Sequence, residues 1–70
     1  MRVTALELAS NDNVRAYLFG EAIKFIAAKN GVSVEMTCEA YRQGVKNVVE
    51  GVAKLVVAGL QGLEEGLRNA

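Results

Sequence analysis

The second half of this 70-residue chain carries one amphipathic pattern of helical period, and that pattern limits what the chain can fold into. At 100° per residue, the charged residues of the stretch 34–69 fall in one arc and the large aliphatic residues fall on the opposite side. A pattern that keeps its phase over 36 residues predicts one continuous amphipathic helix over 34–69. The aliphatic residues are Val45, Val48, Val49, Val52, Val56, Leu60, Leu63 and Leu67.

Glycines line one edge of this apolar face. Each of them costs about 1 kcal/mol of helix stability relative to alanine, so their number needs an explanation. Either the helix is weak and frays after Gly59, or the small residues let another helix approach closely. The five glycines are Gly44, Gly51, Gly59, Gly62 and Gly66.

A shorter helix is expected over 12–30. The polar cluster at 10–13 can cap its start, and Gly31 can close its end in the left-handed conformation. Ser33 then offers an N-cap for the long helix, and the short connection 31–33 should make the two helices a helical hairpin or a sharper helix-turn-helix corner. Residues 1–11 are expected to form an extended or weakly helical arm. That arm should pack through Val3, Leu6 and Leu8.

The unequal lengths of the two helices predict an oligomer. At 1.5 Å per residue, the long helix would span about 54 Å and the shorter one about 28 Å. The helix over 12–30, packed antiparallel on the long helix, would cover it only to about Val52. A hydrophobic content of 51% supports burial of the remaining apolar residues between subunits. We therefore expect a homodimer or a higher homo-oligomer. Its interface is expected at Leu55, Val56, Gly59, Leu60, Gly62, Leu63, Gly66 and Leu67.

The charge balance disfavours nucleic acid and membranes as partners. Eight basic and eight acidic residues give a formal net charge of zero, with no polybasic arm. Glu7 interrupts the N-terminal apolar residues, so no signal peptide is expected. The run 55–63 is the longest uncharged stretch of the long helix, and it is far below the roughly 20 residues that span a bilayer. We expect a cytoplasmic protein, with a helix lying flat on a membrane as the least favoured reading.

The connection between the two helices resembles the turn of a DNA-binding helix-turn-helix motif. Ala27 stands where that motif packs a small residue, Gly31 where it turns, and Val32 where it anchors the second helix. The similarity extends over residues 23–42. It implies a recognition helix whose DNA-facing residues would be Ser33, Thr37, Tyr41 and Arg42.

The chain departs from that motif at several positions. Asn30 and Thr37 stand where apolar core residues are expected. Glu35 and Glu39 on the would-be recognition helix would repel phosphate. DNA binding is therefore the alternative hypothesis, not the main one.

The sequence offers no set of residues for catalysis or for a metal. Histidine is absent, and Cys38 projects into the apolar arc, so a structural cysteine is expected. The carboxylates of Glu35, Glu39, Glu64 and Glu65 lie in the charged arc and are expected to be solvated. Phosphate-binding and dinucleotide-binding motifs are missing as well. We expect no enzyme activity and no cofactor.

These patterns predict one all-α domain over 1–70, a helical hairpin completed by homo-oligomerisation. The main hypothesis is a small non-enzymatic protein–protein interaction module, a regulator, adaptor or inhibitor that binds itself and another protein. The alternative is a helix-turn-helix transcriptional regulator. Compact chains of this kind are common in bacteria and phages, which is where we expect this one.

Overall fold

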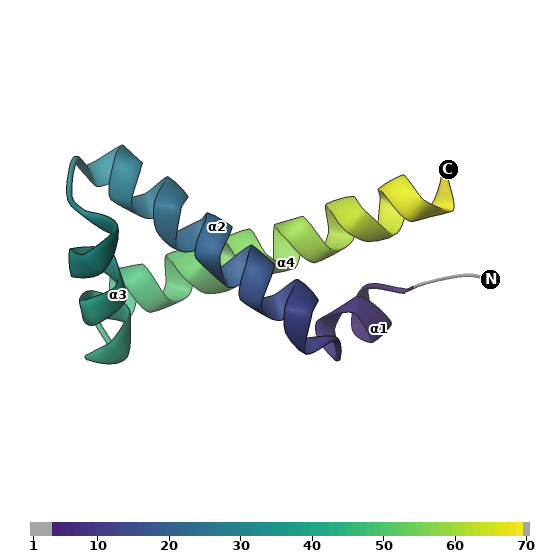
Figure 1. Cartoon of the computed structure of the whole chain (residues 1–70), viewed down its shortest axis with the longest axis horizontal. Helices are drawn as coiled ribbons and strands as arrows, with labels where there is room; N and C mark the ends of the chain where they lie inside the picture. The colour runs from purple at the N-terminus through teal and green to yellow at the C-terminus, as the bar shows by residue number, and fades with distance from the viewer. Residues whose placement is uncertain (1–3, 70) are drawn as a thin grey trace.

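A computed structural model describes residues 4–69 of the chain, and within them the protein forms four α-helices and no strand (Figure 1). The all-α fold class is confirmed. Val3 of the expected N-terminal arm lies outside the described residues. The helices are α1 (Ala5–Ala9), α2 (Asp12–Asn30), α3 (Val34–Arg42) and α4 (Lys46–Arg68).

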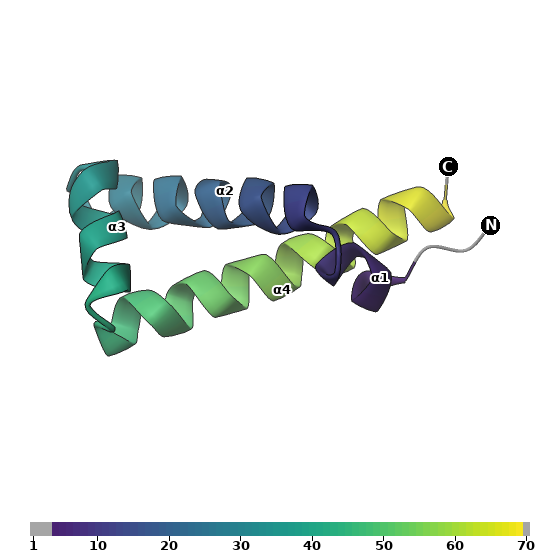
Figure 2. The ribbon, with the colours of Figure 1, turned by 60° about the horizontal axis from the view of Figure 1, so that its bottom comes forward.

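The two longer helices, α2 and α4, cross each other near their middles and form the frame of the molecule (Figure 1). Helix α3 stands across one end of the frame and joins the end of α2 to the start of α4 (Figure 2). Helix α1 lies at the other end, where it contacts both the start of α2 and the second half of α4. The simple hairpin is thus replaced by a crossed pair with a short helix at each end.

The expected continuous helix over 34–69 is wrong, because the chain turns between Arg42 and Lys46. Gly44 adopts a φ of 76°, in the left-handed region. Its N–H donates to the carbonyl of Tyr41 at 3.0 Å, and the N–H of Val45 donates to the carbonyl of Ala40 at 3.0 Å. This pair of bonds is a Schellman motif, which satisfies the last carbonyls of α3 and ends the helix. The apolar residues keep the same helical phase on both sides of this turn, so the sequence pattern alone does not show that the helix ends at Arg42.

The same motif ends α2, where it was expected. Gly31 has a φ of 65°, and the N–H of Val32 donates to the carbonyl of Ala27 at 3.0 Å. Helix α2 covers the same residues, 12–30, as the helix expected from the sequence. Ser33 caps the next helix by accepting the N–H of Met36 at 3.0 Å.

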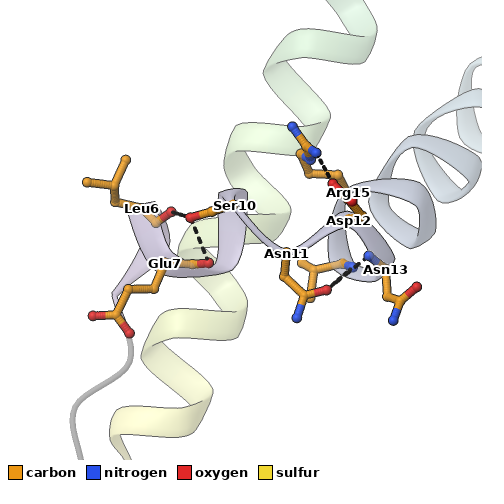
Figure 3. A network of polar contacts seen from close by, with 8 residues as sticks. Leu6, Glu7, Ser10, Asn11, Asp12, Asn13 and Arg15 are labelled. Atoms are coloured by element: carbon orange, nitrogen blue, oxygen red, sulfur yellow. Dashed lines mark hydrogen bonds and ion pairs between the residues drawn. The ribbon is translucent and has the colours of Figure 1, made fainter.

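The start of α2 is capped from the expected polar cluster. The side chain of Asn11 accepts the N–H groups of Asn13 and Val14, at 2.9 and 3.2 Å (Figure 3). Ser10 closes α1 from the other side, because its hydroxyl donates to the carbonyls of Leu6 and Glu7 (Figure 3). Two residues therefore end one helix and begin the next, which holds α1 close to α2.

The core lies where α2 crosses α4. Ala22 and Ile23 of α2 pack with Val52 of α4, and all three are buried. Half-buried side chains surround them, including Cys38, which is therefore part of the packing as expected. The ring of Phe19 meets that of Tyr41 edge to face, with centroids 4.9 Å apart. The other half-buried residues around the core are Ile26, Val48, Leu55 and Val56.

Two of the glycines in α4 explain how closely the helices approach. A Cβ atom on Gly59 would lie 2.6 Å from Cδ2 of Leu18, and one on Gly51 would lie 3.2 Å from Cδ1 of Ile26. Gly62 and Gly66 have no such neighbour within 4 Å. Helix α4 also runs through Gly59 to Arg68, so the fraying alternative is wrong and close approach explains Gly51 and Gly59.

We expect Gly31→Val to lower the free energy of unfolding by about 2 kcal/mol, because a β-branched residue is strained at positive φ. A loss of that size lowers the melting temperature of so small a domain by roughly 10 °C. Gly31→Asn should cost less than half as much, since asparagine tolerates the left-handed conformation. A Cβ meets nothing within 4 Å here, so the difference isolates backbone conformation. Equal melting temperatures for the two variants would contradict the assignment.

A second pair of variants tests the helix crossing. Gly20→Ala, in the open part of α2, should raise the free energy of unfolding by about 0.5–1 kcal/mol through helix propensity alone. Gly59→Ala should give no such gain, because its methyl group would displace the buried side chain of Leu18. Chemical denaturation of both variants measures the contrast. An equal gain in the two would mean that α4 does not need glycine at the crossing.

Candidate interaction surface

The structure divides the residues expected at an oligomer interface into three groups, which are buried, exposed and half-buried. Leu60 is 9% exposed and belongs to the packed interior of the single chain, so its assignment to an interface is wrong. Leu63 and Leu67 are 37% and 52% exposed and remain free to contact another molecule. Gly62 and Gly66, which alternate with them, are also exposed. The half-buried members are Leu55, Val56 and Gly59.

Helix α1 folds back on α4 beyond the crossing, on a part of the helix that the sequence pattern had left uncovered. The N–H of Ala5, at the first turn of α1, donates to Oε2 of Glu64. Oε1 of Glu64 also accepts from Nη2 of Arg68 at 3.0 Å, so the carboxylate of Glu64 contacts both α1 and the last turn of α4. Glu64 is thus an anchor for α1, not a solvated surface charge as the sequence suggested.

A sequence signal for α1 exists, although the pattern of apolar residues conceals it. Thr4 and Glu7 have the spacing of a capping box, S/T-x-x-E, which marks a helix start. In the structure the hydroxyl of Thr4 accepts the N–H of Glu7 at 3.2 Å. Leu6 points outward and is 81% exposed, while Leu8 is half-buried, so the arm packs through only one of these two leucines.

An apolar hollow of about 460 Å³ lies between α2 and α4, and we call it the α2/α4 groove. Its walls are mostly hydrocarbon, and a glutamate and a lysine of α2 stand at its rim. Phe25 on one wall is 57% exposed. The lining residues are Leu18, Glu21, Ala22, Lys24, Phe25, Leu55 and Gly59.

A second hollow of about 370 Å³ lies where α2, α3 and α4 meet. Tyr41 and Phe19 form one side of it, and valines of α4 form the other. Arg15 is the single charged residue of the lining, and it pairs with Asp12 of its own helix (Figure 3). The lining of this hollow also includes Val49, Val52, Ala53, Val56 and Val57.

The residues proposed to face DNA are not gathered on one exposed surface. Thr37 is 3% exposed, and its hydroxyl donates to the carbonyl of Ser33 at 3.1 Å. Tyr41 is half-buried against Phe19. Ser33 and Arg42 are exposed, but Ser33 is engaged as a cap and Arg42 lies 3.7 Å from Glu39. Half of the expected contact set therefore faces the protein interior.

The ion pairs in the described residues 4–69 are local. Within this part of the chain, no cluster of three carboxylate or thiol side chains could hold a metal ion. The ion pairs found there join residues three or four positions apart on one helix, and all of their members except Glu64 have side chains that are more than half exposed. Every buried side-chain nitrogen or oxygen in this range has a hydrogen-bond partner. No helix among these residues combines the length and the apolar content needed to cross a bilayer.

No protein-family model, curated protein or solved structure gives a match to this chain. What the protein can bind must therefore be inferred from its own surface. That surface offers exposed apolar side chains on α2 and α4 and two apolar hollows beside the crossing.

We expect Glu64→Ala to release α1 from α4. The variant should lose about 1 kcal/mol of stability, and the backbone amides of Leu8 and Ala9 should exchange with solvent several-fold faster. Glu65→Ala is the matched control, because Glu65 is exposed on the same turn and should change neither quantity. Native-state hydrogen exchange followed by NMR measures both. Unchanged exchange in α1 of the Glu64 variant would show that the carboxylate does not hold it.

Proposed function

We propose that this protein is a small non-enzymatic protein–protein interaction module that works as a helical homodimer. The exposed apolar side chains of α2 and α4 are the observation that supports this. Phe25 of α2 and Val57, Leu63 and Leu67 of α4 are between 37% and 57% exposed. Large apolar side chains gathered on the surface of so small a chain are typical of a protein-binding face.

Part of this surface is a strip of α4 that we propose as a dimer contact. Leu63 and Leu67 lie one turn apart near the end of the helix, and both are exposed. Gly62 and Gly66 lie beside them, and a side chain there would meet nothing within 4 Å of its Cβ. A helix from a second molecule could therefore approach closely on this strip and cover both leucines.

The chemistry of the surface favours binding over catalysis. The two hollows beside the crossing are lined mainly by hydrocarbon side chains, and the chain has no histidine to move protons near neutral pH. A role as regulator, adaptor or inhibitor in the cytoplasm of a bacterium or phage-infected cell is in keeping with these properties. A single half-buried cysteine suits a reducing compartment.

Capture from cell lysate tests the second partner in this proposal. The tagged protein should retain a protein partner whether or not the lysate is treated with nuclease. Loss of every partner after nuclease treatment would instead favour the helix-turn-helix alternative. In that case the exposed residues Ser33 and Arg42 would be the first candidates for DNA contacts.

We expect the wild-type protein to show at least twice the 7.5 kDa chain mass at micromolar concentration in light scattering. The double variant Leu63→Asp, Leu67→Asp should become monomeric and keep its helicity, because both leucines are exposed within one chain. Leu60→Asp should instead unfold the chain, since it buries an unpaired carboxylate.

Leu6→Asp is the control for adding a charge at an exposed leucine, and it should leave mass and helicity unchanged. A wild-type protein that stays monomeric throughout the micromolar range would overturn the homodimer. A dimer that survives the double substitution would place its interface away from the end of α4.

A further inference from the structure

We infer that a second copy of this chain occupies the α2/α4 groove, with Phe25 of each copy packed against Leu55 and Gly59 of the other. The inference rests on the proposed homodimer and assigns the main part of its interface. It extends the contact from the end of α4 across the groove to α2. The two-fold symmetric dimer would then hold two equivalent contacts, each made by the Phe25 of one copy.

The groove follows from the crossing of α2 and α4. Two crossed helices leave four sectors around the crossing (Figure 1). Helix α3 fills the sector between the end of α2 and the start of α4, and α1 fills the one opposite. The groove lies at the crossing itself, between the α2 residues from Leu18 to Phe25 and the α4 residues Leu55 and Gly59, and no residue of α1 or α3 lines it.

The lining of the groove suits an incoming apolar side chain. Gly59 lines the groove, and a Cβ added there would lie 2.6 Å from Cδ2 of Leu18, so Leu18 would have to move. Phe25 stands on the wall with more than half of its surface exposed, although a phenyl ring gains nothing from contact with water. Exposed aromatic rings beside an apolar hollow are typical anchors of protein interfaces.

The charges at the rim are complementary to those of a second copy. Glu21 and Lys24 lie 3.7 Å apart on the same turn of α2, so the rim carries one charge of each sign. In a two-fold symmetric dimer, a contact from Glu21 to the partner's Lys24 is repeated with the roles exchanged. A strongly acidic or strongly basic ligand would gain no net attraction from this rim.

The groove is also continuous with the strip proposed as a dimer contact. Leu55, Gly59, Gly62 and Gly66 are spaced by four, three and four residues, so they share one face of α4. One partner could therefore cover the groove and the strip together. A contact at Leu63 and Leu67 alone is too small for the roughly 800 Å² that each partner buries in a stable protein complex, so a stable dimer needs more surface than the strip.

Sedimentation equilibrium on aromatic variants tests the groove. Phe25→Ser should weaken dimerisation at least tenfold and leave helicity unchanged. Tyr17→Ser is the matched control: Tyr17 is an equally exposed aromatic residue of α2 that does not line the groove, so its dimer should be unaffected. A wild-type dimer whose affinity is the same in the Phe25 variant would overturn this inference and leave the proposed homodimer standing. A monomeric wild type would overturn both.

A charge exchange at the rim tests the identity of the occupant. Glu21→Lys and Lys24→Glu should each weaken self-association several-fold, because like charges would then face each other across the two-fold axis. An equimolar mixture of the two variants should recover the lost affinity by forming a heterodimer. A mixture that associates no better than either variant alone would show that Glu21 does not face the partner's Lys24.

Discussion

The close contact of α2 and α4 is the constraint on which the rest of this structure depends. A 70-residue chain without disulfides buries little apolar surface, so its small core must be tightly packed. Gly51 and Gly59 achieve this by letting side chains of α2 reach the backbone of α4. The loss of helix propensity at both glycines is offset by contacts that only a residue without a side chain permits. The crossing then determines where α1 and α3 can pack and where hollows remain.

Burial in this protein is therefore uneven along α4. Its first half packs on α2 and α3, α1 packs on it beyond the crossing, and Leu60 is buried. Its last two turns extend beyond these helices, and there Leu63 and Leu67 face outward (Figure 2). Glu64 lies at this boundary, where one face of the helix changes from internal packing to exposed surface. The turns of α4 that follow Glu64 therefore add little to the core, and their apolar side chains stay exposed.

The sequence predicted the elements whose signals are local. The cap at Asn11, the glycine end at Gly31 and the N-cap at Ser33 were all foreseen, because each depends on a few adjacent residues. The turn at Gly44 was missed because the apolar period continues through it, although Gly44-Val45 repeats the pair Gly31-Val32 that ends α2.

The candidate site was predictable only in part, because burial is a property of the whole fold. The apolar pattern correctly marked Leu63 and Leu67 as residues that the chain leaves exposed, but it could not reveal that α1 packs on α4 or that Leu60 is buried. The role of Phe25 depends on the crossing angle of α2 and α4, which no local pattern encodes.

Helix α3 adds a property that its own residues do not suggest. It begins just after one Schellman turn and ends at another, so its nine residues form a strut of about 14 Å between the end of α2 and the start of α4. Helix α3 holds α2 and α4 apart at this end, and the two helices come closer together towards the other end (Figure 2). The width of the α2/α4 groove therefore depends on the length of α3, although no residue of α3 lines the groove. A chain with one turn more or less in α3 could keep every lining residue of the groove and still recognise a partner of different width.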